Sequence, residues 1–533
     1  MNLQKYIAGI IAAAFVAACA TSCQDRLEEQ YQNPEKTTNA SIDKFFTKML
    51  DNRRVRADYW NIRTLLVMHP AVYTNIVSYP NTPKRYQEQL SYLNDYWKDY
   101  FTPNGDGVAG IVPHMREIEK QYATLSAEDK VKADVFLNAA RIVYYDQTSQ
   151  VVDLFGDIPF SEAGMLNLTG ETKAPKFDSA DEIYNALIAG LKESAAYFAT
   201  ASLDPLVASS FGKQDMLLQG SLDKWERYAN SIRLRLLMRI SFQNEQKAKT
   251  EILEMLNAPG DYPLVDETTN NILLSPLTTY TDYMRNAVTE LESHLAPEYL
   301  MENVLRPAND PRIRVLFDKN VNTKTKVPNA DYYSMPANIP STDQETNIAA
   351  GKYAVLDSTT FMFNTKFPGI VITAAEVNFI RAEAFERWGS TAQAQTAYEK
   401  AVKQAVDFVF YLNNVGATFR GVPAEDALTP TEVSDLLASA TVAYTGTTDE
   451  KLAKIWTQKW VDFGFMQSIQ GWSEVRRTKY PQLTFVPDTG TPGSVNPPSR
   501  LLYPDSEKVY NATNYESVQS KDTRDTKIFW DVH

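Results

Sequence analysis

The two cysteines of this chain lie close together at its start, as Cys19 and Cys23, and none follows. The body of the protein therefore cannot contain a disulfide bond, a zinc-thiolate site or a cysteine nucleophile. Its fold has to be stabilised by a core of buried apolar side chains. A chain of 533 residues is long enough for this, because large proteins bury most of the surface that their unfolded chains expose.

The segment around these cysteines has the organisation of a secretory signal. Lys5 precedes an apolar run from Ile7 to Cys19, and polar residues begin at Gln24. The run is too short to span a bilayer. Its length and its position fit the apolar region of a signal peptide.

The end of this segment predicts a lipid anchor. Ala20-Thr21-Ser22-Cys23 fits a lipobox, where bacterial lipoproteins are cleaved and acylated, so we predict a signal peptide over 1–22 and lipidation of Cys23. Cleavage by signal peptidase I after Ala18-Cys19-Ala20 is the alternative. Residues 23–40 are polar and predict a flexible tether, which leaves 41–533 as a single folded domain.

Net charge and hydropathy limit the classes of partner that this domain can bind. The chain has a formal net charge of −13, which argues against a nucleic-acid partner. No later stretch has the apolar length of a membrane-spanning helix, so membrane attachment would depend on acyl chains at Cys23. With 29 tyrosines and 8 tryptophans, the chain can fill a core and still present aromatic rings to a ligand.

Apolar side chains at helical spacing dominate the first half of the domain and predict an all-α fold. Ser41 is expected to cap the first helix. In the helix predicted over 221–241, the side chains of Arg233, Arg235 and Arg239 are expected to lie along the helix flank and to cover apolar surface with their stems. The predicted helices cover residues 42–50, 59–77, 86–100, 113–123, 127–152, 179–199 and 221–241.

The second half alternates between irregular and helical sequence. Residues 258–370 are rich in Pro, Asn, Thr and Tyr and lack a period, which predicts a loop-rich region of the kind that is usually functional or disordered. Helices return over 374–483, where Ala374–Val406 has the spacing of a tetratricopeptide (TPR) helix pair. Residues 484–533 are predicted to form a C-terminal loop and tail, anchored by Phe529 and Trp530. Further helices are predicted over 431–440 and 449–470.

Five sequence blocks together resemble one protein family. The most informative are GWSEVRRTKYPQL (Gly471–Leu483) and SRLLYPDSEKVYN (Ser499–Asn511). Upstream blocks are YQNP (Tyr31–Pro34), YYDQTSQVVDLFGDIPFSEA (Tyr144–Ala163) and AEVNFIRAEAFERWG (Ala375–Gly389). The blocks stand in the order found in the SusD/RagB family of Bacteroidetes outer-membrane lipoproteins, and the chain resembles its SusD-like branch.

This resemblance implies an architecture and a role. The fold would consist of TPR-like helix pairs that carry an irregular, ligand-facing half. The protein would be anchored on the cell surface through Cys23 and would capture oligosaccharides, or peptides in RagB-like members. Its partner would be a SusC-like TonB-dependent transporter, over which it would act as a lid. A purely structural lid that recognises no free ligand is a further alternative.

The signature residues of the C-terminal blocks are expected to be structural. Trp472 should pack in the core, and Glu474 should pair with Arg476 or Arg477. These arginines would brace the C-terminal loop through forked hydrogen bonds. Arg500 and Tyr503 are expected to fix the return of that loop.

The sequence contains few signals of an enzyme. The four histidines are widely separated, and metal-binding, nucleotide-binding and serine-hydrolase motifs are absent. A pair of carboxylates would suffice for a glycosidase, so a secreted hydrolase remains an alternative. We predict a binding protein without catalytic residues, metal or other cofactor.

Stacking of sugar rings on aromatic side chains is the chemistry expected of a glycan-binding face, with polar groups reading the hydroxyl directions. By analogy with the family, the aromatic residues should come from the loop after the second helix and from the middle third. The candidates for stacking are Tyr73, Tyr79, Tyr280, Tyr283, Tyr332 and Tyr333, and the polar candidates are Asn81, Asn286 and Asp331. For each tyrosine, half-buried packing is the alternative.

Overall fold

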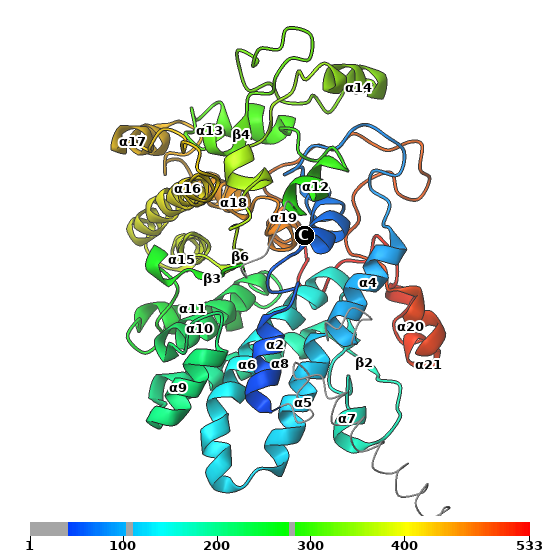
Figure 1. Ribbon diagram of the computed structural model, residues 1–533, viewed down its shortest axis with the longest axis vertical. Coiled ribbons are helices and arrows are strands. Elements are labelled where there is room, and N and C mark those ends of the chain that lie inside the picture. The colour runs from blue at the N-terminus through cyan, green and yellow to red at the C-terminus, as the bar shows by residue number, and fades with distance from the viewer. Residues whose placement is uncertain (1–40, 103–109, 277–282) are drawn as a thin grey trace, which may run out of the picture.

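The computed structural model describes residues 41–102, 110–276 and 283–533. It confirms the all-α fold, because helices make up most of the described chain and the strands are short (Figure 1). None of the helices in these ranges has an apolar run long enough to cross a membrane. The predicted lipidation site, Cys23, lies outside the described residues.

The first half of the domain is a layered set of helices (Figure 1). α6 begins where Ser126 accepts a hydrogen bond from the Asp129 backbone and ends at Gly156, whose φ of 81° suits glycine. The elements are α2 (Ile42–Leu50), α3 (Tyr59–Asn61), the π-helical turn η1 (Ile62–Val67), the 3-10 turn η2 (Val72–Thr74), α4 (Leu90–Phe101), α5 (Ile111–Thr124), α6 (Ala127–Phe155), β1 (Ile158–Pro159), α7 (Leu166–Thr169), β2 (Phe177–Asp178), α8 (Ala180–Thr200), α9 (Pro205–Gln214), α10 (Leu222–Arg239) and α11 (Glu245–Asn257).

The middle region, 258–370, is made of short elements joined by loops. Its strands form two antiparallel two-stranded sheets, β3 with β6 and β4 with β5. Figure 1 places α14 and its loops at the edge of the molecule, away from α8 and α10. The elements are η3 (Thr268–Asn270), β3 (Ile272–Leu274), α12 (Tyr283–Thr289), η4 (Tyr299–Leu305), α13 (Ile313–Leu316), β4 (Phe317–Asp318), α14 (Ser341–Ala349), β5 (Val355–Leu356), η5 (Ser358–Met362) and β6 (Gly369–Ile372).

The C-terminal region begins with the TPR-like helix pair. In its core the Tyr398 ring lies 6.3 Å from the Phe379 ring, and the Tyr398 hydroxyl donates to the Val442 carbonyl over 2.8 Å. Trp530, after the last helical turn, is fully buried and donates through Nε1 to Asp153 over 2.9 Å. The elements are α15 (Ala374–Trp388), α16 (Thr391–Arg420), α17 (Pro430–Ala438), α18 (Thr448–Phe463), α19 (Ser468–Thr478), α20 (Asp505–Tyr510), α21 (Ala512–Tyr515) and η6 (Gln519–Lys521).

Two predicted helices are divided in the structure. The segment 59–77 forms α3, η1 and η2, because Pro70 lacks the N–H that a continuous helix requires. The segment 449–470 is split into α18 and α19 at Gly464, whose φ of 51° favours glycine. After the first break, the chain leaves η2 toward the loop 75–86.

The arginines of α10 correct another prediction. Arg233, Arg235 and Arg239 do not lie along an exposed flank, because all three are buried. Their guanidinium groups reach carboxylates on three other elements, at 2.8 Å for Glu251, 2.6 Å for Glu376 and 3.5 Å for Asp153. Buried charges need such partners, and here the partners cross-link the helical layers.

A close approach between α16 and η5 gives a testable prediction. A Cβ atom at Gly416 would overlap the Thr359 carbonyl oxygen. Gly416→Ala should therefore lower the free energy of unfolding by about 1–3 kcal/mol, although alanine favours helix over glycine by about 1 kcal/mol. Urea unfolding measures this, with Gly471→Ala in α19 as the control.

That control meets no steric conflict, because the nearest atom to a Cβ at Gly471 is the Phe463 Cβ at 3.8 Å, an ordinary van der Waals contact. Gly471→Ala should leave stability unchanged or raise it. Equal effects of the two substitutions would contradict the close approach of α16 to η5.

Candidate functional site

A cleft with a volume of about 150 Å³ opens between four segments that are far apart in the sequence. Tyr79 comes from the loop after η2, Tyr299 from the start of η4, Ala337 from the loop before α14, and Thr484 from the C-terminal loop. Both tyrosines are half-buried. We call this the tyrosine cleft.

The tyrosine rings combine apolar faces with free hydroxyls. In the described part of the chain, neither hydroxyl has a hydrogen-bond partner. Burial raises the pKa of Tyr79 and Tyr299, so both hydroxyls stay protonated at neutral pH. The Tyr299 ring is held in place by the buried Trp460, whose ring lies 6.0 Å away edge to face.

Polar side chains surround the two rings and are fixed by the backbone. Asn75 donates to the Thr484 carbonyl over 2.9 Å, and the Glu298 carboxylate accepts from the Ala337 backbone over 2.8 Å. Arg85, Glu302 and Asn303 complete the polar lining. Two half-buried rings among ordered donors and acceptors can bind a pyranose through its C–H face and its hydroxyls.

A second cleft, of about 350 Å³, lies beyond η4 and is called the arginine cleft. Tyr332 lies in its wall together with two ion pairs. Arg306 contacts Asp331 at 2.9 Å, and Arg314 contacts Glu432 at 2.6 Å. The lining residues are Arg306, Asn309, Asp310, Pro311, Ile313, Arg314, Asp331, Tyr332, Glu432 and Asp435.

The carboxylates of these ion pairs stay ionised over a wide pH range. Hydrogen bonds from Arg314 lower the pKa of Glu432 to about 2. For Asp331, the Tyr332 backbone and Arg306 outweigh burial and lower the pKa below its usual value. Both carboxylates therefore stay ionised at neutral pH.

Two of the predicted ligand residues have structural roles. Tyr73 is buried with 2 % exposure, and its ring packs 5.1 Å from Trp472, so its prediction as a stacking residue is wrong. The side-chain amide of Asn81 donates to the carbonyls of Ala337 and Ile339 over 2.5 and 2.8 Å. Asn81 thus fixes the loop beside the tyrosine cleft and has no free amide hydrogen for a ligand.

The other candidates are divided among several places. Tyr280 lies outside the described residues, and Tyr283 begins α12. Asn286 is exposed on the same helix, outside both clefts. Tyr333 is 42 % exposed, between the residues that line the arginine cleft and those that line the tyrosine cleft. The structure brings only Tyr79, Tyr332 and Asp331 into clefts.

Sequence reasoning missed the residues that complete both clefts. Tyr299 and Glu302 belong to η4, and Arg306 follows it directly, in a region predicted to lack helices. The apolar spacing of Tyr299–Leu305 directly after Pro297 was the available signal. Arg85 and Arg314 carry no sequence signal for ligand binding, because their clefts form only in the folded protein.

The signature residues of α19 are buried and form a charge network. Trp472 is 2 % exposed, and the Arg476 guanidinium lies 3.8 Å from the centre of its ring. Glu474 contacts Arg477 at 2.7 Å and Lys459 at 3.0 Å. Burial would raise the pKa of Glu474, but Arg477, Lys459 and Arg239 outweigh it and hold the pKa well below its usual value. These contacts support a structural role.

The C-terminal loop is tied to the helices by backbone hydrogen bonds. Arg476 donates to the carbonyls of Ser499 and Asp153 over 2.9 and 2.8 Å. Arg500 donates to the Lys521 carbonyl, and its guanidinium lies 4.4 Å from the centre of the Tyr503 ring. The Tyr503 hydroxyl donates to the Asp157 carbonyl over 2.6 Å.

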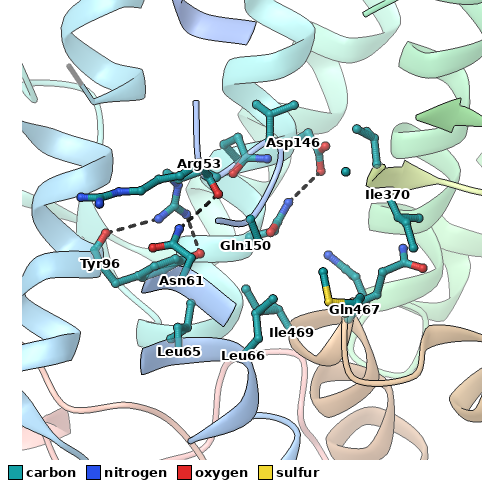
Figure 2. Close-up of a pocket in the computed structure, with 18 of the residues that line it drawn as sticks. Arg53, Asn61, Leu65, Leu66, Tyr96, Asp146, Gln150, Ile370, Gln467 and Ile469 are labelled. Carbon is teal, nitrogen blue, oxygen red and sulfur yellow. Dashed lines mark hydrogen bonds between the residues drawn. The ribbon is translucent and has the colours of Figure 1, made fainter. Parts of the chain in front are cut away.

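Figure 2 shows a smaller cavity, of about 70 Å³, between α6, η1 and β6. Several of its polar groups form hydrogen bonds within the protein. Arg54 donates to the Tyr96 hydroxyl, and Asp146 accepts from Tyr228 at 2.7 Å and from Arg235 at 3.3 Å. A polar cavity of this size suits a few water molecules rather than a sugar ring.

The described residues contain no group of three His, Cys, Asp or Glu side chains arranged to hold a metal ion. His69 is buried, and burial lowers its pKa to about 4. Its Nε2 accepts from the Gln89 backbone over 3.2 Å, which gives it a structural role. In the tyrosine cleft, Glu298 and Glu302 both accept hydrogen bonds from the protein.

Comparison with solved structures identifies the fold. The chain is similar to a chitin-binding protein, with 21 % identity, 93 % of this chain and 100 % of that chain covered, and a TM-score of 0.72. It is similar to a chitin-binding SusD homologue from Flavobacterium johnsoniae, with 22 % identity, coverage of 92 % and 99 %, and a TM-score of 0.68. It is also similar to a SusD homologue from Bacteroides fragilis, with 18 % identity, 92 % of this chain and 100 % of that chain covered, and a TM-score of 0.70.

Comparison of sequences identifies the family. A search of curated proteins finds no match. The SusD-like family model, described as "Starch-binding associating with outer membrane", matches residues 31–504. Because this match covers most of the chain and the fold agrees with it, the protein belongs to the SusD-like family.

Proposed function

We propose that this protein is a non-enzymatic, cell-surface glycan-binding protein, and that the tyrosine cleft is its binding site. The observation that supports this most directly is the pair of half-buried rings, Tyr79 and Tyr299, among polar groups fixed by the backbone. Rings in this setting stack on sugars, and their free hydroxyls add hydrogen bonds. The family description as starch-binding agrees with a carbohydrate ligand.

The proposal includes a place for the protein in nutrient uptake. Lipidation at Cys23 would attach it to the outer membrane, in agreement with the family description. The polar tether 23–40 would let the domain move while it stays attached. A SusC-like TonB-dependent transporter would receive the captured oligosaccharide. Peptide capture by the same transporter system, as in RagB-like proteins, is the alternative ligand class.

Substitution of the cleft tyrosines tests the binding site. We expect Tyr79→Ala and Tyr299→Ala each to weaken glycan binding about tenfold, which corresponds to about 1.4 kcal/mol, because each removes a stacking surface. Isothermal titration calorimetry would use two series, maltose to maltohexaose and chitobiose to chitohexaose. Starch is named by the family description and chitin by two of the similar structures.

Tyr411→Ala is the matched control, because this tyrosine is 49 % exposed on α16 and outside both clefts. It should leave affinity unchanged. Retained affinity in both cleft variants would contradict the site. If neither glycan series binds and a peptide library does, the peptide alternative replaces the proposal. Release of shorter sugars over time would indicate a hydrolase.

A further inference from the structure

The tyrosine cleft and the arginine cleft share two walls. One wall is η4 together with Arg306, the residue that follows it. The other is the loop 331–337, whose first residues line the arginine cleft and whose last residues line the tyrosine cleft. The two clefts therefore lie next to each other in the loop-rich region.

Charged contacts join the walls between the clefts. Glu302, in the tyrosine cleft, contacts Arg306 at 3.2 Å and accepts from the Ser334 hydroxyl over 2.7 Å. Arg306 continues to Asp331 in the arginine cleft at 2.9 Å. Glu302 and Arg306 are one helical turn apart, roughly 5–6 Å. A few linked sugar rings can cover such a separation.

The arginine cleft contains the same types of groups as the tyrosine cleft. Tyr332 is half-buried, and the Lys319 ammonium lies 5.1 Å from the centre of its ring. The two ion pairs of the same lining hold the side chains of Arg306 and Arg314 in place. Arg306 and Arg314 keep 30 % and 21 % of their side chains exposed, so some of their N–H groups still face solvent. An aromatic ring flanked by ordered donors and acceptors is suited to a sugar ring.

Charge balance in this cleft favours a neutral ligand. The charges of Arg306 and Arg314 are compensated by Asp331 and Glu432. Two other acids line the cleft. Asp310 pairs with the buried Arg312 at 2.6 Å, whereas Asp435 is exposed and would repel an anionic sugar. Neutral hydroxyls can accept from the arginines and donate to the carboxylates without disturbing either pair.

We infer that the arginine cleft is a second subsite for the same oligosaccharide, and that the chain passes from the tyrosine cleft over the exposed Tyr333. The ligand is then a neutral oligosaccharide long enough to occupy both clefts, rather than a mono- or disaccharide. This inference rests on the proposed function, because the tyrosine cleft must bind the first part of the chain.

Dependence of affinity on chain length tests the second subsite. For the series that binds, the hexasaccharide should bind wild-type protein at least about tenfold more tightly than the disaccharide, a gain of about 1.4 kcal/mol. Tyr332→Ala should remove most of this gain and leave disaccharide affinity unchanged. Tyr332→Phe keeps the ring and should retain the gain, and thermal unfolding of each variant verifies that the domain is folded.

The outcomes separate the two proposals. If disaccharide binding depends on Tyr79 but Tyr332→Ala leaves the gain with chain length intact, the second subsite is wrong and the tyrosine cleft stands. Equal affinity of wild-type protein for disaccharide and hexasaccharide would likewise contradict the second subsite but not the tyrosine cleft. If no oligosaccharide binds, or if Tyr79→Ala and Tyr299→Ala are without effect, the proposed function itself fails and the second subsite fails with it.

Discussion

Arg477→Met is expected to lower the free energy of unfolding by about 3–5 kcal/mol, because it leaves buried carboxylates without their partner. Arg477 is fully buried, and its Nη2 lies 2.6 Å from Glu383 and 2.7 Å from Glu474. Urea unfolding followed by tryptophan fluorescence measures the loss. Lys132→Met removes a cation from an exposed pair with Glu128 and should have no measurable effect.

The same substitution should change how stability depends on pH. Burial would raise the pKa of Glu383, but the charge of Arg477 outweighs burial and lowers it. The pKa of Glu474 is lowered for the same reason. A carboxyl group whose pKa is lowered by folding contributes stability that is fully present above its pKa in the unfolded chain, about 4.3 for glutamate. This stability is lost as the pH falls toward the pKa in the folded protein. The variant should lose this part of the acid dependence. A parallel pH profile for both proteins, offset by less than about 1 kcal/mol, would contradict the role of Arg477.

Trp472→Ala is expected to cost about 3–5 kcal/mol of stability, because it opens a cavity in the core. The ring packs between Tyr73, 5.1 Å away, and the guanidinium of Arg476, 3.8 Å from its centre. Thermal unfolding measures the loss. Trp388→Ala, at a half-buried indole bonded to Glu245, should cost less.

Glycan affinity separates this structural role from a role in binding. At a temperature where the variant is folded, Trp472→Ala should bind oligosaccharide as tightly as wild-type protein does. Trp472→Phe, which keeps part of the ring, provides the same test if the alanine variant does not fold. Loss of affinity in a folded variant would show that Trp472 acts on the ligand.

Helices were predictable because their signals are local. α6 was predicted over 127–152 and extends from Ala127 to Phe155, between the Ser126 cap and Gly156. The α15–α16 pair was evident from small residues and aromatics at fixed spacing. Errors occurred where one residue overrides the periodicity, as Gly464 does between α18 and α19.

The candidate site was predictable only in part, because its residues come from distant segments. Tyr79 fell in the expected loop, but its partner Tyr299 belongs to a turn that follows a proline in an irregular region. Tyr73 has the same residue type and lies close in sequence, yet it packs against Trp472. Periodicity and composition cannot distinguish these two tyrosines, since tertiary contacts decide which ring is buried.

The position of Trp530 has a consequence for the order in which the protein folds. Its indole is fully buried and bonds to Asp153, 377 residues earlier in the chain. Asp153 also accepts from the Tyr184 hydroxyl, so the last tryptophan completes a site to which α6 and α8 contribute. Closing so long a loop costs more entropy than forming local contacts, so we expect this contact to form after the local helical ones. The helices of the first half can therefore assemble early, but their shared interior stays open to water until nearly the whole chain is available.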